Sequence, residues 1–229
     1  MDMKLGLHTC GWGDRPVPGA LVAARKLGYD GVELAPAWLE KAYDGLAEID
    51  RFLVQEDVPL APAVFVGGPR IDDAGLAESV DQTTRYARWA RQHGGDRVIY
   101  STVQGKDGLR TNEERERLRH AWDAVAEAAA AEGCTPLYHN HYVVSHEVSR
   151  ALLEKDMELI DWSQWKLCVD TGHLVLALHD PVSFVEEWSD KIAWMHCKDV
   201  KTCTFQEPET HRPMATIVPH FTSLGTGVV

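Results

Sequence analysis

Short apolar segments alternate along the chain with longer segments whose apolar residues recur at helical spacing. The apolar segments are rich in β-forming residues, and uninterrupted apolar runs of this length are typical of strands buried on both faces. Seven strands are expected, at residues 4–9, 30–35, 59–66, 96–102, 135–141, 165–170 and 192–197. This strand–helix alternation predicts an α/β fold with a parallel sheet.

The segments between the expected strands contain signals of helix starts. Thr111 and Glu114 have the spacing of a capping box, in which the threonine hydroxyl caps a backbone N–H and the glutamate reaches back. Asp180 is followed by Pro181, and proline is well tolerated at the first helical position. We therefore expect helices to begin after residues 111 and 180.

Two architectures fit seven strands with helices between them: a doubly wound sheet and a (β/α) barrel. No Gly-x-Gly-x-x-Gly sequence follows the first expected strand, so a dinucleotide-binding sheet has no support. The sequence contains no internal repeat, low-complexity stretch or linker. One domain over residues 1–229 is expected.

Polar and ionisable residues lie at or near the C-terminal ends of the expected strands. They are His8, Glu33, His139, His141, Asp170 and His196. In a barrel, this end of the strands is the active-site face. Because residues two apart on a strand share a face, His139 and His141 are expected to point the same way and Asn140 the other way.

Imidazole and carboxylate groups therefore converge from several strand ends. Together with His173, the last four of those residues form a donor set that suits Mn, Zn, Fe or Co, and suits Mg alone less well. Each histidine taken singly also fits a structural, hydrogen-bonded role. The succession of three such strand ends is what indicates a divalent metal site.

The residues around two of these strand ends resemble a known family. Residues 168–173 read Cys-Val-Asp-Thr-Gly-His, and residues 194–199 read Trp-Met-His-Cys-Lys-Asp. This pairing resembles the xylose isomerase-like TIM barrel superfamily, which holds sugar phosphate isomerases and epimerases, inosose dehydratases and the endonuclease IV branch. His-Asn-His at 139–141 and Phe-Thr-Ser-Leu-Gly-Thr-Gly at 221–227 are similar to the inosose dehydratase-like branch.

The resemblance implies a (β/α)8 TIM barrel, although only seven strands are expected. In the family, the turn at residues 221–227 leads into a helix and a last strand, so the barrel is expected to lack its last strand-helix unit at the C-terminus. Three explanations stay open: a truncated chain, a strand exchanged with a second copy in a domain-swapped homo-oligomer, and natural loss.

The resemblance also implies a set of metal ligands. Asp170 and His196 correspond to two of them. The first ligand in the family is usually a glutamate that ends the fifth strand, and here His139 or His141 takes its place. His141 is favoured because it lies nearer the end of the strand. His173 corresponds to a contact with a substrate hydroxyl or phosphate.

Two residues are expected to be catalytic, Glu147 and Lys198. Glu147 falls where the inosose dehydratase-like branch has an acidic residue, and it is the candidate base that removes a proton. The alternative is a carboxylate that only stabilises a helix N-terminus. Lys198 follows His196 in the His-x-Lys-Asp motif and is expected to contact the substrate or support the ligands.

Further substrate-binding candidates are His8, Trp12, Glu33 and Arg212. An arginine in a polar segment after the seventh strand suits a phosphate or carboxylate, and a solvated loop arginine is its alternative. Glu33 also fits an ion pair at the barrel mouth, and Trp12 also fits simple packing.

The function expected from these residues is a metal-dependent isomerase, epimerase or dehydratase acting on a small sugar or cyclic polyol. A cation that binds a carbonyl and a neighbouring hydroxyl assists removal of the proton alpha to the carbonyl. A non-catalytic barrel that binds a small molecule or a partner is the alternative, motivated by the incomplete ligand set.

Composition excludes other classes. The net charge of −12 repels phosphate backbones, which argues against nucleic acid as a partner and against the endonuclease IV branch. The five cysteines have no Cys-x-x-Cys spacing, and no apolar run approaches the ~20 residues of a membrane helix. The N-terminus lacks a secretory signal pattern, so a cytoplasmic protein without a membrane partner is expected.

Overall fold

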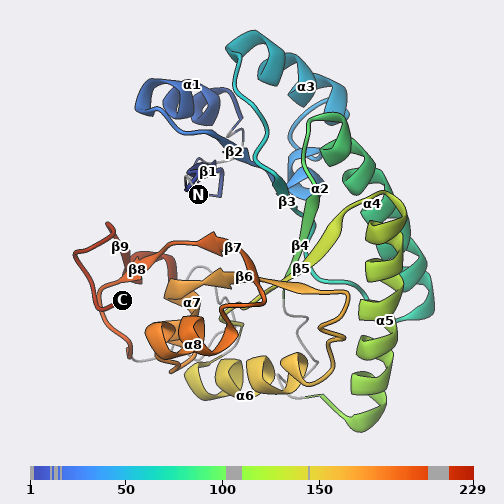
Figure 1. Ribbon diagram of the computed structural model, residues 1–229, viewed down its shortest axis with the longest axis vertical. Coiled ribbons are helices and arrows are strands. Elements are labelled where there is room, and N and C mark those ends of the chain that lie inside the picture. Colours follow the sequence, from blue (N-terminus) through green and yellow to red (C-terminus); the bar gives the residue numbers. More distant parts are fainter. Residues whose placement is uncertain are drawn as a thin grey trace. The chain divides into compact units, whose positions relative to one another are not determined.

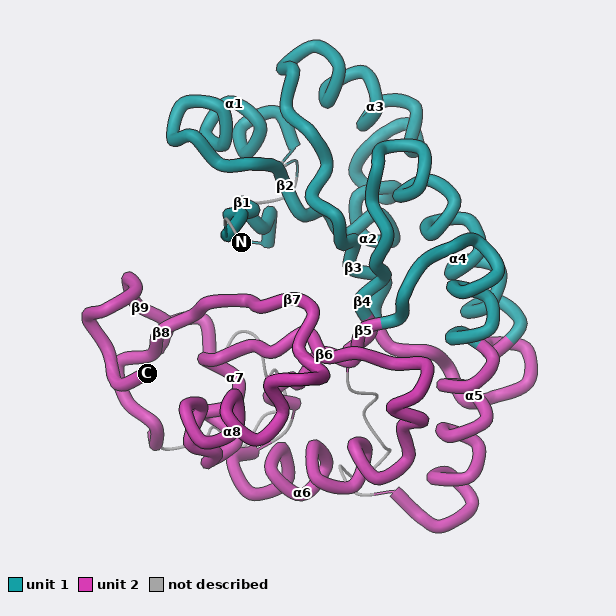
Figure 2. The backbone as a smooth tube through the Cα atoms, viewed as in Figure 1, with its two compact units in different colours: residues 1–67, 77–99, 125–136 teal, residues 68–76, 100–124, 137–229 magenta. Residues whose placement is uncertain are grey.

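The structure is a computed structural model that describes residues 3–10, 12, 15, 17–101, 110–143, 145–205 and 217–229. These residues fall into two compact units, shown in different colours in Figure 2. Unit 1 comprises Met1–Gly67, Ala77–Ile99 and Val125–Pro136, and unit 2 comprises Gly68–Leu76, Tyr100–Ala124 and Leu137–Val229. The single domain expected over residues 1–229 stays a prediction.

All seven expected strands are confirmed, each inside its expected range (Figure 1). They are β1 (Gly6–His8), β2 (Gly31–Glu33), β3 (Ala63–Phe65), β4 (Arg97–Ser101), β5 (Thr135–His139), β6 (Lys166–Asp170) and β7 (Ile192–His196). The helices between them are α1 (Val17–Leu27), α2 (Pro36–Leu39), α3 (Gly45–Glu56), α4 (Asp73–Gln92), α5 (Asn112–Ala131), α6 (His146–Met157), α7 (Thr171–Leu176) and α8 (Pro181–Trp188). The expected α/β alternation is therefore present.

Unit 1 holds the first strands and their helices. Strands β1 and β2 pair in parallel, with His8 opposite Glu33, and β3 and β4 pair in parallel as well. Helix α1 shows how the local sequence fixes the packing, because its buried residues recur at the spacing of one helix face. These residues are Val17, Ala20, Leu21 and Ala24.

Unit 2 holds β6, β7 and the part of β5 from Leu137 onward, and these parallel strands lie in the order β5, β6, β7. Among the described residues after β7, the strands are β8 (Asp199–Val200) and β9 (Phe221–Thr222), which pair antiparallel, with the 3-10 helix Val218–His220 between them. The part of the chain that the structure describes therefore contains seven strands of the parallel barrel type, as expected.

None of the described helices combines the length and the apolar composition that a bilayer crossing requires.

The capping box before α5 is confirmed. The backbone N–H of Glu114 donates to the Thr111 hydroxyl at 3.2 Å, and the Thr111 N–H donates to the Glu114 carboxylate at 2.8 Å. Asp180 likewise caps α8, accepting from the N–H of Ser183 at 2.9 Å. These caps satisfy N–H groups that a helix start leaves without partners.

Thr111→Ala is expected to lower the free energy of unfolding by ~1 kcal/mol, the usual cost of removing an N-cap hydroxyl. Urea denaturation measures the change. Thr111→Ser keeps the hydroxyl and serves as the control, with stability near that of the parent protein. An equal loss in both variants would show that the hydroxyl is not what stabilises this helix.

The core of unit 2 contains an aromatic cluster and a buried ion pair. Tyr100, Trp122, Tyr138 and Trp165 pack edge to face, with neighbouring ring centroids 5.2–6.3 Å apart. The Arg110 guanidinium donates to the Asp156 carboxylate, and both side chains are at most 2% exposed. The pair joins the segment before α5 to the C-terminal turn of α6.

Candidate metal centre

The C-terminal ends of β5, β6 and β7 bring a cluster of ionisable side chains together in unit 2. An irregularity in the β6–β7 pairing determines which side chains belong to this cluster. Leu167 lies opposite Ile192, but Cys168 lies opposite Trp194, so the register shifts by one residue. As a result Asp170 lies opposite His196. Without the shift it would face Met195, whose side chain alternates to the other face.

The Asp170 carboxylate is the centre of the cluster. Its Oδ2 lies 2.5 Å from Lys198 Nζ, 3.5 Å from His139 Nε2, and 3.8 Å from both His173 Nε2 and His196 Nδ1. His139 Nε2 and His196 Nδ1 are hydrogen-bonded at 2.8 Å. Oδ1 accepts from the N–H of His173 at 3.0 Å and so caps α7. One carboxylate therefore ends a strand, starts a helix and faces three imidazoles.

Asn140 holds the backbone of Asp170 in place. Its amide Nδ2 donates to the Asp170 carbonyl at 2.9 Å, and its Oδ1 accepts from the Asp170 N–H at 2.8 Å. These two side-chain hydrogen bonds lie just past the end of the β5–β6 pairing, whose last register pair is His139 and Cys168. Sequence reasoning assigned Asn140 no role, although an amide between two histidines at a strand end is a signal of such an anchor.

Each residue of the Thr-Gly pair after Asp170 contacts Lys198. The Thr171 hydroxyl donates to the Lys198 carbonyl at 2.6 Å and accepts from its N–H at 3.0 Å. Gly172 leaves room for that residue, since a Cβ there would lie 2.8 Å from Lys198 Cβ and 3.1 Å from the Phe221 ring. The Lys198 ammonium lies over the same ring, 5.4 Å from its centroid.

His141 and His173 lie side by side with opposite hydrogen-bonding roles. Their ring centroids are 4.0 Å apart. His141 Nδ1 lies 2.6 Å from the Tyr142 carbonyl, which only accepts, so this nitrogen carries the proton and Nε2 keeps a lone pair. His173 Nδ1 accepts from the Tyr142 N–H at 3.2 Å, so its Nε2 carries the proton. That buried Nε2 has no hydrogen-bond partner among the described residues.

Burial sets the charges of the cluster. It lowers the pKa of His139 to about 3 and that of His141 to about 4, because an enclosed imidazolium loses its hydration. Burial, then the neighbouring His141, lowers the pKa of His173 well below its ordinary value. Burial alone would raise the pKa of Asp170, but His173 and Lys198 outweigh it and hold that pKa well below its usual range. The cluster thus offers neutral imidazoles and an ionised carboxylate.

Acidification is expected to destabilise the metal-free protein between pH 6.5 and about 4. In this window unfolded histidines bind protons, whereas His139, His141 and His173 do not, so stability falls as the pH falls. Burial raises the pKa of Asp156 to about 6, and that carboxyl has the opposite sign: its contribution is present below its ordinary pKa and is lost as the pH rises through 6. The loss of stability from the three histidines is larger than the gain from this one carboxyl, so the net effect of acidification is destabilising.

Urea unfolding with a chelator at pH 7.5, 6 and 5 measures this dependence. Each histidine contributes up to ~1.4 kcal/mol per pH unit. His141→Gln is expected to flatten the slope by about one proton. Stability that stays constant or rises on acidification would contradict the expectation.

Of the other expected site residues, three lie in unit 1, one lies on the surface of unit 2, and one lies outside the described residues. In unit 1 the His8 Nε2 lies 3.3 Å from the buried Glu33 carboxylate, and the Trp12 ring packs 3.5 Å from where a Gly19 Cβ would be. In unit 2 Glu147 is exposed in the first turn of α6, a position that suits its alternative role at a helix N-terminus. Arg212 lies outside the described residues.

The donor set of the cluster fits a divalent metal ion. His139, Asp170 and His196 supply two imidazoles and a carboxylate from three adjacent strands, which are donor types that suit Mn, Zn, Co or Fe. His139 Nε2 lies 3.5 Å from Asp170 Oδ2 and 2.8 Å from His196 Nδ1, whereas the His141 ring lies against His173, with 4.0 Å between the ring centroids. The geometry therefore favours His139 over His141 as the first donor.

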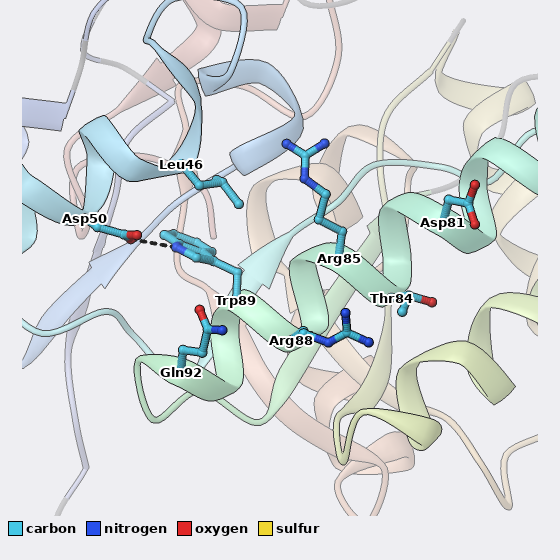
Figure 3. Close-up of a pocket in the computed structure, with 8 residues that line it drawn as sticks. All are labelled: Leu46, Asp50, Asp81, Thr84, Arg85, Arg88, Trp89 and Gln92. Carbon is cyan, nitrogen blue, oxygen red and sulfur yellow. Dashed lines mark hydrogen bonds between the residues drawn. The ribbon is translucent and has the colours of Figure 1, made fainter.

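A separate hollow of about 490 Å³ lies in unit 1 between α3 and α4 (Figure 3). Its polar side chains hold the helices together. Asp50 accepts from the indole N–H of Trp89 at 2.7 Å, as the dashed line in Figure 3 shows, and Arg88 pairs with Glu132 at 2.6 and 3.2 Å. These contacts give Asp50, Trp89 and Arg88 a structural role in joining the helices.

Parallel strands joined by helices, with imidazole and carboxylate groups at their C-terminal ends, define a TIM-barrel type of protein. The chain belongs to the xylose isomerase-like TIM barrel family, whose sequence model matches residues 21–228. The family resemblance read from the sequence is thereby confirmed.

Two relatives of this chain are inosose dehydratases. Inosose dehydratase of Lacticaseibacillus casei is 32% identical over 91 residues, which make up 40% of this chain and only 30% of that protein. Inosose dehydratase of Geobacillus kaustophilus strain HTA426 is 24% identical over 220 residues, covering 86% of this chain and 70% of the relative. The homologues of this chain are thus enzymes of a sugar-modifying family.

A solved structure supports the fold. The probable 3-DHS dehydratase AsbF from Bacillus anthracis matches with a TM-score of 0.71 at 16% identity, covering 99% of this chain and 85% of that one. At this identity the likeness concerns the fold alone.

Proposed function

We propose that this chain is a divalent-metal-dependent enzyme that removes a proton alpha to a carbonyl group of a sugar or cyclic polyol. One observation carries the proposal: donors from the ends of β5, β6 and β7 converge on Asp170 Oδ2, within 3.8 Å. The relatives named inosose dehydratase support a cyclic polyol ketone as substrate. Isomerisation, epimerisation and dehydration all begin with this proton removal.

His139, Asp170 and His196 would hold the metal, with Mn, Zn, Co and Fe as candidates. When bound, such a cation draws electron density from a carbonyl group and so makes the adjacent C–H more acidic. Asn140 keeps the Asp170 backbone fixed for this role through its two hydrogen bonds.

The neighbouring side chains would handle protons and orient the substrate. The lone pair on His141 Nε2 is free near neutral pH, because burial lowers the pKa of this imidazole to about 4 and keeps it neutral. The proton on His173 Nε2 can be donated to a substrate hydroxyl, since no described residue accepts it. The Lys198 ammonium lies 2.5 Å from Asp170 Oδ2. Its positive charge would stabilise the negative charge that develops on the substrate carbonyl oxygen when the proton is removed.

Glu147 remains the other candidate base. It is exposed on α6, while His141 lies beside His173 in the cluster. The proposal therefore gives proton removal to His141. The later fate of the proton sets the product: return to a neighbouring carbon isomerises, return to the opposite face epimerises, and loss of a β-hydroxyl dehydrates.

Deuterium exchange into substrate, followed by NMR, tests this proposal. Inososes and ketoses are incubated in D₂O with the metal-loaded protein, His141→Gln, Glu147→Gln and, as a surface control on the same helix as Glu147, Glu154→Gln. We expect exchange at the carbon alpha to the carbonyl in the parent protein, in Glu147→Gln and in Glu154→Gln, and its loss in His141→Gln. Loss in Glu147→Gln instead would make that carboxylate the base. A metal-loaded protein without exchange on any carbonyl sugar would favour the non-catalytic barrel.

A further inference from the structure

Cys168 lies beside the proposed metal ligands. It stands two residues before Asp170 on β6, so the two side chains share a face. In the β5–β6 register it lies opposite His139, and its side chain is fully buried. Three possible ligand atoms lie within 4.8 Å of one another: the Cys168 Sγ and one imidazole nitrogen each from His139 and His196.

This spacing is close to what one metal ion spans. At a tetrahedral angle, a Zn–S bond of ~2.3 Å and a Zn–N bond of ~2.1 Å place two donors about 3.6 Å apart. Side-chain movements of about 1 Å would bring the sulfur and the two imidazoles onto one ion. His139 and His196 also face Asp170, so the thiol would join the ligands already proposed.

The other cysteines lie elsewhere or are exposed. Cys10, Cys197 and Cys203 are exposed, and Cys197 follows His196 directly in the chain. Cys134 is buried in unit 1, where burial raises the pKa of its thiol to about 11. Cys168 is therefore the thiol that the strand pairing brings to the histidines.

We infer that Cys168 is a ligand of the metal centre and makes it selective for Zn²⁺, Co²⁺ or Fe²⁺ over Mn²⁺ and Mg²⁺. Thiolate and imidazole favour the former ions, whereas oxygen donors suit the latter. Metal binding would release the thiol proton to solvent. This inference rests on the proposed function, because it names the class of metal taken by the same site.

Cobalt absorption spectroscopy on the full chain tests the inference. Bound Co²⁺ gives visible ligand-field bands with any of these ligands, but a near-ultraviolet charge-transfer band only when a thiolate is coordinated. Spectra are recorded during Co²⁺ titration of the parent protein, Cys168→Ser and Cys197→Ser, the last being the matched control one residue after His196. We expect the charge-transfer band in the parent protein and in Cys197→Ser, and its loss in Cys168→Ser with the ligand-field bands retained.

The other outcomes separate the two proposals. Ligand-field bands without a charge-transfer band in the parent protein, or loss of that band in Cys197→Ser, would overturn the role of Cys168 and leave the metal centre standing. Absence of all cobalt bands would overturn both. A chelator competition adds a second readout: Cys168→Ser should reduce the preference for Zn²⁺ over Mn²⁺ by on the order of tenfold, and an unchanged ratio would contradict the inference.

Discussion

Replacing Asp170 by asparagine is expected to lower the affinity for a divalent cation by at least ~100-fold, because changes outside the ligand set already cost 10–100-fold. Asp170 Oδ2 faces His139 and His196, the two other proposed metal ligands, at 3.5 and 3.8 Å. Asparagine keeps the volume and the oxygen that caps α7, but removes the negative charge. The fold should therefore survive while the metal is lost. Isothermal titration with Zn²⁺ and Mn²⁺ measures the affinity.

The chain provides a matched control for this change. Asp180 also caps a helix, accepting from Ser183 at 2.9 Å at the start of α8. Asp180→Asn makes the same chemical change at a helix start that lacks the histidine cluster, and should leave metal affinity within about twofold of the parent value. Equal losses in the two variants, or undiminished affinity in Asp170→Asn, would remove Asp170 from the metal centre.

Replacing Asp156 by asparagine is expected to lower the free energy of unfolding by ~3–5 kcal/mol. The Arg110 guanidinium and this carboxylate are at most 2% exposed. Nε and Nη2 of Arg110 have no other hydrogen-bond partner among the described residues, so the carboxylate is what compensates the charge. Asparagine keeps the shape and leaves a buried cation without its counter-charge. Urea denaturation monitored by tryptophan fluorescence gives the value.

Two further variants show whether the buried charge causes this loss. Glu154→Gln removes a partner of the exposed pair Arg150–Glu154 on the same helix as Asp156, and should cost less than ~0.5 kcal/mol. The double variant Arg110→Met/Asp156→Leu removes both buried charges and should recover most of the stability lost in Asp156→Asn. A cost below ~1 kcal/mol for Asp156→Asn would mean that water compensates the guanidinium.

Local signals account for the parts of the fold that the sequence predicted well. Apolar runs marked all seven strands; β2 and β3 are buried along their whole length, as such runs predict, whereas β1 and β7 are partly exposed. The starts of α5 and α8 followed from Thr111 and Asp180, since an N-cap depends on residues within three positions of it. The cluster of Asp170, His173 and His196 followed from parallel strands placing their C-terminal ends together.

Features that depend on residues distant in sequence were not predicted. The register shift that sets Asp170 opposite His196 depends on how β7 packs, and nothing near Ile192 signals it. The Arg110–Asp156 pair joins residues 46 positions apart, and charged residues are ordinarily expected at the surface. His141 was favoured over His139 as the first metal ligand because it lies nearer the strand end, whereas the contact of His139 with His196, 57 positions away, depends on strand pairing that spacing does not show.

Anomalous X-ray diffraction from crystals grown with Zn²⁺, recorded on both sides of the zinc absorption edge, tests the metal centre most directly. We expect one strong anomalous peak within bonding distance of the Asp170 carboxylate and the imidazoles of His139 and His196. A zinc ion bound elsewhere, or no ordered ion at these three side chains, would contradict the account.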